Sequence, residues 1–225
     1  ALALACAPLA GAAATVDVVV SGADGKPLSA RLAALWPNLA SLPVLTARAH
    51  LGLLPRGAVR SEFHAQLRAF LDATGLFPAH VDSHDHVHAL PIVRNLLLDA
   101  AEHMRPVPAV RSTACLPGPG FALRRALVRL SGGRALGQEL VQRELAHNPA
   151  LFGLYDPAET DYRALVQAWL AAVPPQGAML ACRPSDGIDP DASPRHAARE
   201  AAQKSLRRNM VSRWLLIPSR NLTKR

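Results

Sequence analysis

Short apolar runs alternate with helical segments along this chain, and this alternation constrains its fold more than any other feature. Residues 15–20 are rich in β-branched side chains and residues 177–182 are apolar, a composition typical of buried strands. Residues 61–75, 91–103 and 160–172 instead repeat apolar side chains at the spacing of a helix with one buried face. Strands alternating with helices predict an α/β architecture built on a parallel sheet.

Capping and turn residues set the expected limits of these elements. Ser61 is a candidate N-cap and Gly75 a stop signal for the first helix, and Pro91 opens the second. The prolines within 28–58 predict an irregular segment there. The remaining expectations are an extended segment at 76–88, a short strand at 107–112, helices at 122–130 and 138–147 with a turn at the glycine pair between them, and Trp169 in the core.

Length and composition exclude several classes of protein. The chain has 225 residues, of which 50% are hydrophobic and 19% charged, which suits one sizeable core and excludes wholesale disorder. It has no uninterrupted apolar run of about 18 residues, so no membrane partner is expected. Cys6, Cys115 and Cys182 share no short spacing, which indicates neither a disulfide framework nor a cysteine zinc site and favours a reducing cytoplasm.

The two ends of the chain differ from its body. Residues 1–14 resemble the hydrophobic core of a secretion signal, although an Ala/Leu run is equally compatible with a buried strand and helix start. Residues 195–225 hold nine Lys and Arg against one acidic residue, whereas residues 1–194 are neutral. We therefore expect a body at 1–194 and a basic C-terminal helix or tail at 195–225. A tail that contacts RNA is an alternative, but no RNA-binding motif accompanies it and nucleic acid is not an expected partner.

Histidines are concentrated in residues 80–88. Side chains on a strand alternate between its two faces, so an extended segment would place four imidazoles and one carboxylate on one face. These residues are His80, Asp82, His84, His86 and His88. Such a face predicts metal binding or catalysis, because burying these groups unpaired would be costly. The alternative is a polar face that only lines a loop or a hydrated pocket. The spacing does not identify the ion, and Asp82 is the natural partner to fix an imidazole tautomer.

Residues 78–91 resemble the central motif of the YdjC-like carbohydrate deacetylase family. The shared pattern is Pro-x-His-hydrophobic-Asp-Ser-His-x-His-hydrophobic-His, with a proline three residues later. That family includes chito-oligosaccharide deacetylases and deacetylases associated with hopanoid biosynthesis. Weaker similarity includes residues 25–28, Arg111 and residues 152–153. The resemblance implies an α/β fold, namely a distorted, incomplete (β/α) barrel like those of polysaccharide deacetylases.

The resemblance also implies a chemistry. Family members are metal-dependent hydrolases that remove N-acetyl groups from amino sugars, with Mg or Zn held by one Asp and two His and a second Asp as the base. By position, His84 matches the metal-ligating histidine of this segment. Asp82, His86, His88 and Arg111 match residues placed around the metal ligands or against the sugar.

Three departures from the family pattern weaken the catalytic assignment. The family's Ala-Asp-Asp-Phe-Gly strand, which carries the ligand Asp and the base Asp, has no counterpart, so the catalytic residues are unassigned. Val19 occupies the position of the second ligand histidine, and Arg183 that of a C-terminal histidine. The chain is therefore expected to be an N-terminally truncated or degenerate member.

Two functions follow from these observations. The first is a deacetylase acting on N-acetylated carbohydrate, with activity retained, reduced or lost. The alternative is a remnant that binds carbohydrate or a partner subunit without catalysis. A homo-oligomer is left open by the sequence.

Overall fold

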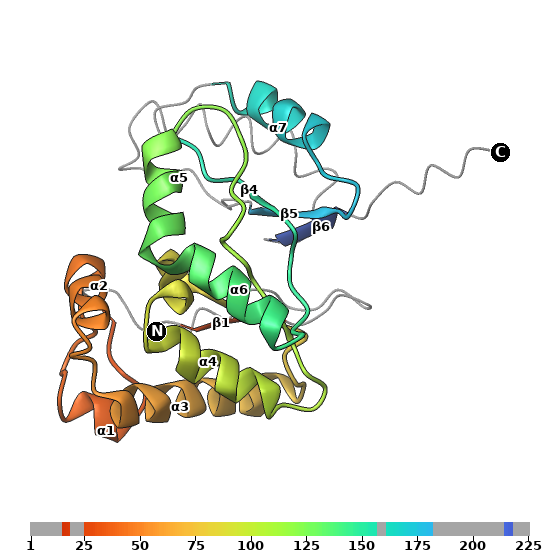
Figure 1. The fold of residues 1–225 in the computed structure, drawn as a ribbon. Coiled ribbons are helices and arrows are strands. Elements are labelled where there is room, and N and C mark those ends of the chain that lie inside the picture. The colour runs from red at the N-terminus through yellow and green to blue at the C-terminus, as the bar shows by residue number, and fades with distance from the viewer. Residues whose placement is uncertain (1–14, 19–24, 157–160, 182–213, 218–225) are drawn as a thin grey trace, which may run out of the picture. The chain divides into compact units, whose positions relative to one another are not determined.

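The computed structural model describes residues 15–18, 25–156, 161–181 and 214–217 (Figure 1). The chain divides into two compact units, which are described separately. The first consists of Ala1–Ala114 with Leu130–His147, and the second of Cys115–Arg129 with Asn148–Arg225. Each unit has one three-stranded sheet and its own apolar core. The predicted boundary at 194/195 lies outside the described residues.

The sheet of the first unit is parallel, as the alternation of strands and helices predicts. Its strands lie in the order β1 (Thr15–Val18), β2 (His80–Ser83) and β3 (Ala109–Val110). Thr15 is paired with His80, and Val81 is paired with Val110. Parallel strands need long crossover connections, and the helices between β1 and β3 provide them. Both flanking strands are therefore parallel to the strand that begins the histidine segment.

Most of the π-helical turn η2 (Arg129–Gly133) belongs to the first unit, and six further helical elements of the described residues lie wholly within it. They are α1 (Ala30–Ala33), α2 (Leu42–His50), α3 (Arg56–Thr74), the 3₁₀ turn η1 (His84–Ala89), α4 (Val93–Glu102) and α6 (Arg134–Gln142). Figure 1 shows α3 and α4 running beside each other, and the two helices are in contact. Gly75 ends α3 in the left-handed conformation, as predicted.

Ser61 is not the N-cap of α3, because the helix begins five residues earlier, at Arg56. The Ser61 hydroxyl lies inside the helix and donates to the carbonyl of Gly57. The helix α4 begins within two residues of the predicted Pro91 start. The apolar period therefore located both helices. The start of α3 was misplaced, because a serine hydroxyl can bond to the backbone inside a helix as well as at its N-cap.

The prediction that residues 28–58 are irregular is wrong. Ser29 caps α1 by accepting a hydrogen bond from the Leu32 amide, and Pro43 lies in the first turn of α2. Proline is compatible with a first helical turn because the amide that it lacks has no partner there. Pro43 and Pro55 thus mark where α2 and α3 start.

The core of the first unit is formed by side chains from the sheet, η1 and the helices. Its members include Phe63, Val81, Val87, Leu97, Val110 and Leu136. Gly132 approaches this core through its backbone, since a Cβ at that position would lie 2.0 Å from the carbonyl oxygen of Ala89. Only glycine permits this contact. It brings the turn before α6 against the end of η1.

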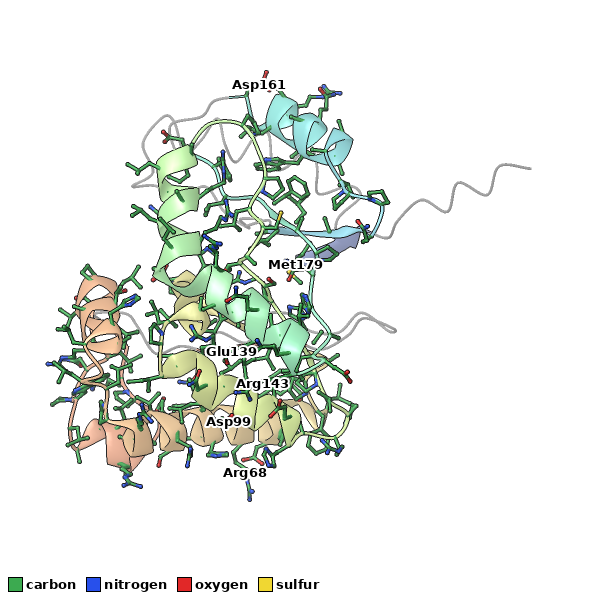
Figure 2. The ribbon with its side chains drawn as sticks, viewed as in Figure 1. Arg68, Asp99, Glu139, Arg143, Asp161 and Met179 are labelled. Carbon is green, nitrogen blue, oxygen red and sulfur yellow. The ribbon has the colours of Figure 1, made fainter. Side chains whose placement is uncertain are left out.

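The second unit holds the remaining helices and strands. They are α5 (Ala122–Val128), β4 (Leu151–Phe152), α7 (Tyr162–Ala171), β5 (Ala178–Ala181) and β6 (Trp214–Ile217). The strand β4 is parallel to β5, and β6 is antiparallel to β5. The strand β6 lies within the stretch expected to be a basic tail. Asp161 caps α7 by accepting from the Ala164 amide, and Figure 2 labels it at that end of the helix.

Trp169 is buried in the core of the second unit, as predicted, with Phe152 and Leu180. A π-helical turn, η2 (Arg129–Gly133), follows α5 and contains the predicted glycine turn. The expected helix at 138–147 is shifted, because α6 ends at Gln142.

The chain thus has a mixed α/β fold with short parallel strands. The described residues form no closed barrel. The finer expectation of a distorted, incomplete (β/α) barrel stays a prediction. Among the same residues, no helix has the length and apolar character needed to cross a membrane.

Candidate functional site

The histidine segment changes conformation after Ser83. Residues up to Ser83 form β2, and His84 begins the 3₁₀ turn η1. Asp85 and His86 have φ values of 54° and 60°, in the left-handed region that few non-glycine residues adopt. The prediction that residues 80–88 alternate along one strand is therefore wrong beyond Ser83. The imidazoles of the segment do not share one face.

Ser83 explains the turn. Its Oγ accepts the His88 backbone amide at 2.9 Å and lies 2.5 Å from Nδ1 of the His88 ring. The Ser83 hydroxyl is thus a hydrogen-bond partner for both the backbone amide and the ring of His88, five residues further along the chain. This side-chain contact competes with a continued strand, as serine hydroxyls do at turns.

Asp82 and Arg111 form a buried ion pair next to Ser83, the last residue of β2. Both side chains are buried, and Nη2 of Arg111 pairs with Oδ1 of Asp82. The same Nη2 donates to the Ser83 carbonyl at 2.8 Å, and the Ser83 amide lies 2.6 Å from Asp82 Oδ1. A buried carboxylate and a buried guanidinium are each costly alone, so the pair is held together by its own charges.

His88 joins this network as a neutral ring. Its Nε2 lies 2.8 Å from the Arg111 carbonyl oxygen, which only accepts, so Nε2 carries the proton. Nδ1 then accepts from the Ser83 hydroxyl. Burial, with a smaller effect of the Arg111 charge, lowers the pKa of His88 to about 3. We define the buried network as Asp82, Ser83, His88 and Arg111.

His80 lies at the other end of β2, buried and without a hydrogen-bond partner for Nε2 among the described residues. Burial, followed by the Arg111 charge, lowers its pKa to about 4. The ring is therefore neutral near pH 7. It contributes no charge to the site.

The His84 side chain, unlike those of the buried network, is exposed to solvent. It is 43% exposed, and its Nε2 lies 3.6 Å from a carboxylate oxygen of Asp85. His86 follows, half-buried. These residues lie immediately beyond the carboxyl end of a parallel strand, where ligands of α/β folds commonly bind. We call His84 and Asp85 the exposed pair.

The described residues do not fit a divalent-cation site by themselves. Both ring nitrogens of His88 are engaged, and the Asp82 carboxylate is paired with Arg111. The part of the chain that the structure describes contains no group of three His, Cys, Asp or Glu able to hold a metal ion. The departures at Val19 and Arg183 lie outside the described residues. The ligand role of His84 stays a prediction.

The resemblance placed Asp82, His86, His88 and Arg111 around the metal ligands or against the sugar, and that role stays a prediction. In the structure, Arg111 contacts both Asp82 and His88, whereas His86 is not part of the buried network. Sequence reasoning missed Ser83, which the strand pattern assigned to the opposite face. The available signal was the Asp-Ser pair at the end of a short apolar run, since both residues favour turns.

A comparison with models of protein families shows which family this chain resembles. The family model described as YdjC-like protein matches residues 18–217. The chain belongs to the YdjC-like family. The YdjC-like match covers the buried network, the exposed pair and elements of both units.

Two curated relatives share shorter stretches with this YdjC-like chain. A carbohydrate deacetylase of Xenopus laevis is 46% identical over 54 residues, which are 24% of this chain and 18% of the relative. A carbohydrate deacetylase of Danio rerio is 43% identical over 47 residues, 21% of this chain and 15% of the relative. The matched stretches thus span less than a fifth of either relative.

Proposed function

We propose that this YdjC-like chain serves the deacetylation of N-acetylated carbohydrate. In that reaction a water oxygen bonds to the acetyl carbon as the amide C–N bond breaks. One proton of the water passes to the leaving nitrogen and the other is released from the new carboxyl group, which gives the free amine and acetate. Membership of the family and the two relatives named carbohydrate deacetylase support this choice of reaction.

The observation that carries the proposal is the exposed pair held on a fixed turn. His84 and Asp85 stand at the carboxyl end of β2, and the buried network fixes the backbone on both sides of them. A catalytic or binding side chain gains from such support, because its geometry is set before substrate arrives. We assign His84 as the residue of this site that takes part in the reaction.

Acetate release from chito-oligosaccharides tests the proposal. We expect turnover by the wild-type chain and a loss on the order of 100-fold or more in His84→Ala, as for removal of a side chain on which the reaction depends. His64→Ala is the matched control, because His64 is an exposed histidine on α3 outside the site. Equal rates in wild type and His84→Ala would overturn the assignment.

The cofactor, Mg or Zn, is a separate prediction. Metal analysis of wild type and His84→Ala after saturation with each ion tests it without an activity assay. Metal bound to wild type and reduced in the variant would support a ligand role for His84. Equal metal content, or none in either protein, would contradict it. The cytoplasmic location and the homo-oligomer also stay predictions.

A second candidate function is carbohydrate binding without turnover. It is favoured by the lack of a three-ligand group among the described residues. Calorimetric titration with the same oligosaccharides separates the two functions. Binding that depends on His84 without acetate release would support the second, and neither binding nor turnover would exclude both.

A further inference from the structure

The helix α5 presents leucines to solvent. Leu123 is 74% exposed and Leu127, one turn later, is 58% exposed. No residue of α5 is buried. Leucines at positions i and i+4 lie on the same side of a helix, so these two form one apolar face. Apolar side chains gathered in this way commonly mark an interaction surface.

Arginines flank this apolar face. Arg124, Arg125 and Arg129 lie within or directly after α5, and the sequence contains no Asp or Glu between Glu102 and Glu139. Arg124 lies over the Phe121 ring, and Arg125 donates to the Pro119 carbonyl. None of the ion pairs found among the described residues involves these three arginines. We define the α5 surface as Leu123, Arg124, Arg125, Leu127 and Arg129.

The charge of the α5 surface restricts what can cover it. A second copy meeting it through the same face would oppose two sets of three arginines, which repel each other. The chain's own segment 195–225 is also basic, with nine Lys and Arg against one acidic residue. Both occupants are therefore disfavoured, and an anionic partner fits.

We propose that α5 docks on the surface of an anionic lipid bilayer. Helices that lie in a membrane interface combine a leucine-rich face with arginines on the polar side. The leucines would enter the boundary of the acyl chains while the guanidinium groups bind lipid phosphates. A bilayer is favoured over an acidic protein because it accepts a convex helix without a complementary groove.

In this contact α5 lies parallel to the membrane surface and does not span the bilayer. The sequence expectation of no membrane partner rests on the length of apolar runs, a criterion that concerns spanning segments only. Two leucines on α5, with three arginines within or directly after the helix, suit a helix that lies in the membrane interface. The proposal is independent of the deacetylation reaction, because it uses no residue of the exposed pair or the buried network.

Co-sedimentation with lipid vesicles tests the proposal. Vesicles of phosphatidylcholine alone are compared with vesicles of phosphatidylcholine and phosphatidylglycerol, using the full chain and a sample without vesicles. We expect binding on the order of tenfold or more tighter to the anionic vesicles, weakened by added salt. Equal binding to both vesicles, or none to either, would overturn the proposal.

Variants then locate the contact. We expect the double variant Leu123→Ser/Leu127→Ser and the triple variant Arg124→Gln/Arg125→Gln/Arg129→Gln each to lose most of the binding to anionic vesicles. Leu76→Ser/Phe77→Ser is the control for exposed apolar side chains and Arg68→Gln for an exposed charge. Circular dichroism confirms that each variant is folded. Unchanged binding of folded α5 variants, or binding to polyglutamate but not to vesicles, would show that the bilayer is not the partner.

Discussion

The ring of His88 connects Ser83 to Arg111 within the buried network. It accepts from the Ser83 hydroxyl and donates to the Arg111 carbonyl, and its ring is fully buried. We expect His88→Leu to lower the free energy of unfolding by about 2–5 kcal/mol, because two buried polar groups lose their partner. Urea denaturation followed by circular dichroism measures the change.

Two further variants interpret that result. His88→Gln keeps an amide that donates to the Arg111 carbonyl, so its cost should be smaller than that of His88→Leu. His64→Leu replaces an exposed histidine of α3 and should change stability by no more than about 0.5 kcal/mol. A loss in His88→Leu no larger than in His64→Leu would mean that the ring does not hold the turn.

The two buried histidines predict acid sensitivity. The pKa of His80 is lowered to about 4 and that of His88 to about 3, from 6.5, by burial and then by the Arg111 charge. Below pH 6.5 the unfolded chain binds protons that the folded chain does not, so stability falls as the pH falls towards 4. Each histidine contributes up to about 1.4 kcal/mol per pH unit to this slope.

Unfolding in urea at pH 7, 6 and 5 at constant ionic strength measures the slope. His80→Asn should flatten it by the share of one histidine, while His64→Asn, an exposed control, should not. A slope that is the same in wild type and His80→Asn would contradict neutral burial of His80.

The residues of the site differ in how far the sequence predicts their placement. The resemblance singled out Asp82, His86, His88 and Arg111, and in the structure Arg111 contacts both Asp82 and His88. Their role around a metal or a sugar stays a prediction. Strand periodicity failed at Ser83, because its hydroxyl binds the His88 amide and bends the chain. The alternation of side chains along a strand does not predict this hydrogen bond, because it joins two residues that are five positions apart.

At the scale of elements, ion pairs connect α4 to α6. Arg143 follows α6 and lies 2.9 Å from Asp99 and 3.1 Å from Glu102, both on α4. Arg94 of α4 lies 2.6 Å from Glu139 of α6. Figure 2 labels Asp99, Glu139 and Arg143 close together, with Arg68 pointing outward from α3. The hydrogen bond to Asp99 is the main cause that raises the pKa of Arg143.

This network predicts a measurable coupling between the two helices. We expect Arg143→Ala to lower the free energy of unfolding by about 1 kcal/mol, and a double-mutant cycle with Asp99→Ala to give a coupling of about 0.5 kcal/mol or more that decreases with salt. The exposed pair Arg68 and Asp72, 3.8 Å apart on α3, is the matched control and should couple more weakly. Equal coupling in the two cycles would contradict a network effect.

The longest helices were predicted from the sequence. The apolar period located α3, α4 and α7, the longest helices with one buried face. The short helices α1 and α2 were missed, because four to nine residues show too little of a period and their prolines resemble breakers. Ser29 and Pro43 favour their first turns, and burial of Leu32 and Leu45 holds them in place.

At the scale of the whole molecule, the chain passes between its two units more than once. The first unit is completed by residues Leu130–His147, which return after the second unit has begun. Composition predicts one sizeable core, and it carries no signal for this exchange. The division arises from separate apolar clusters, with Phe63 in one and Phe152 in another.

Separate clusters predict that the units open separately. Phe63 and Phe152 are both buried, and truncation of a buried phenylalanine to alanine typically costs about 3–5 kcal/mol. We expect Phe152→Ala to accelerate hydrogen exchange at the amides of Leu151 and Met179, which donate to Cys115 and Ala150 in the second unit. The amides of Val110 and Arg111, bonded within the first unit, should exchange at nearly the wild-type rate. Phe63→Ala should give the reverse pattern in the same mass-spectrometric measurement. Acceleration of all four amides by either variant would mean that the two clusters unfold as one cooperative structure.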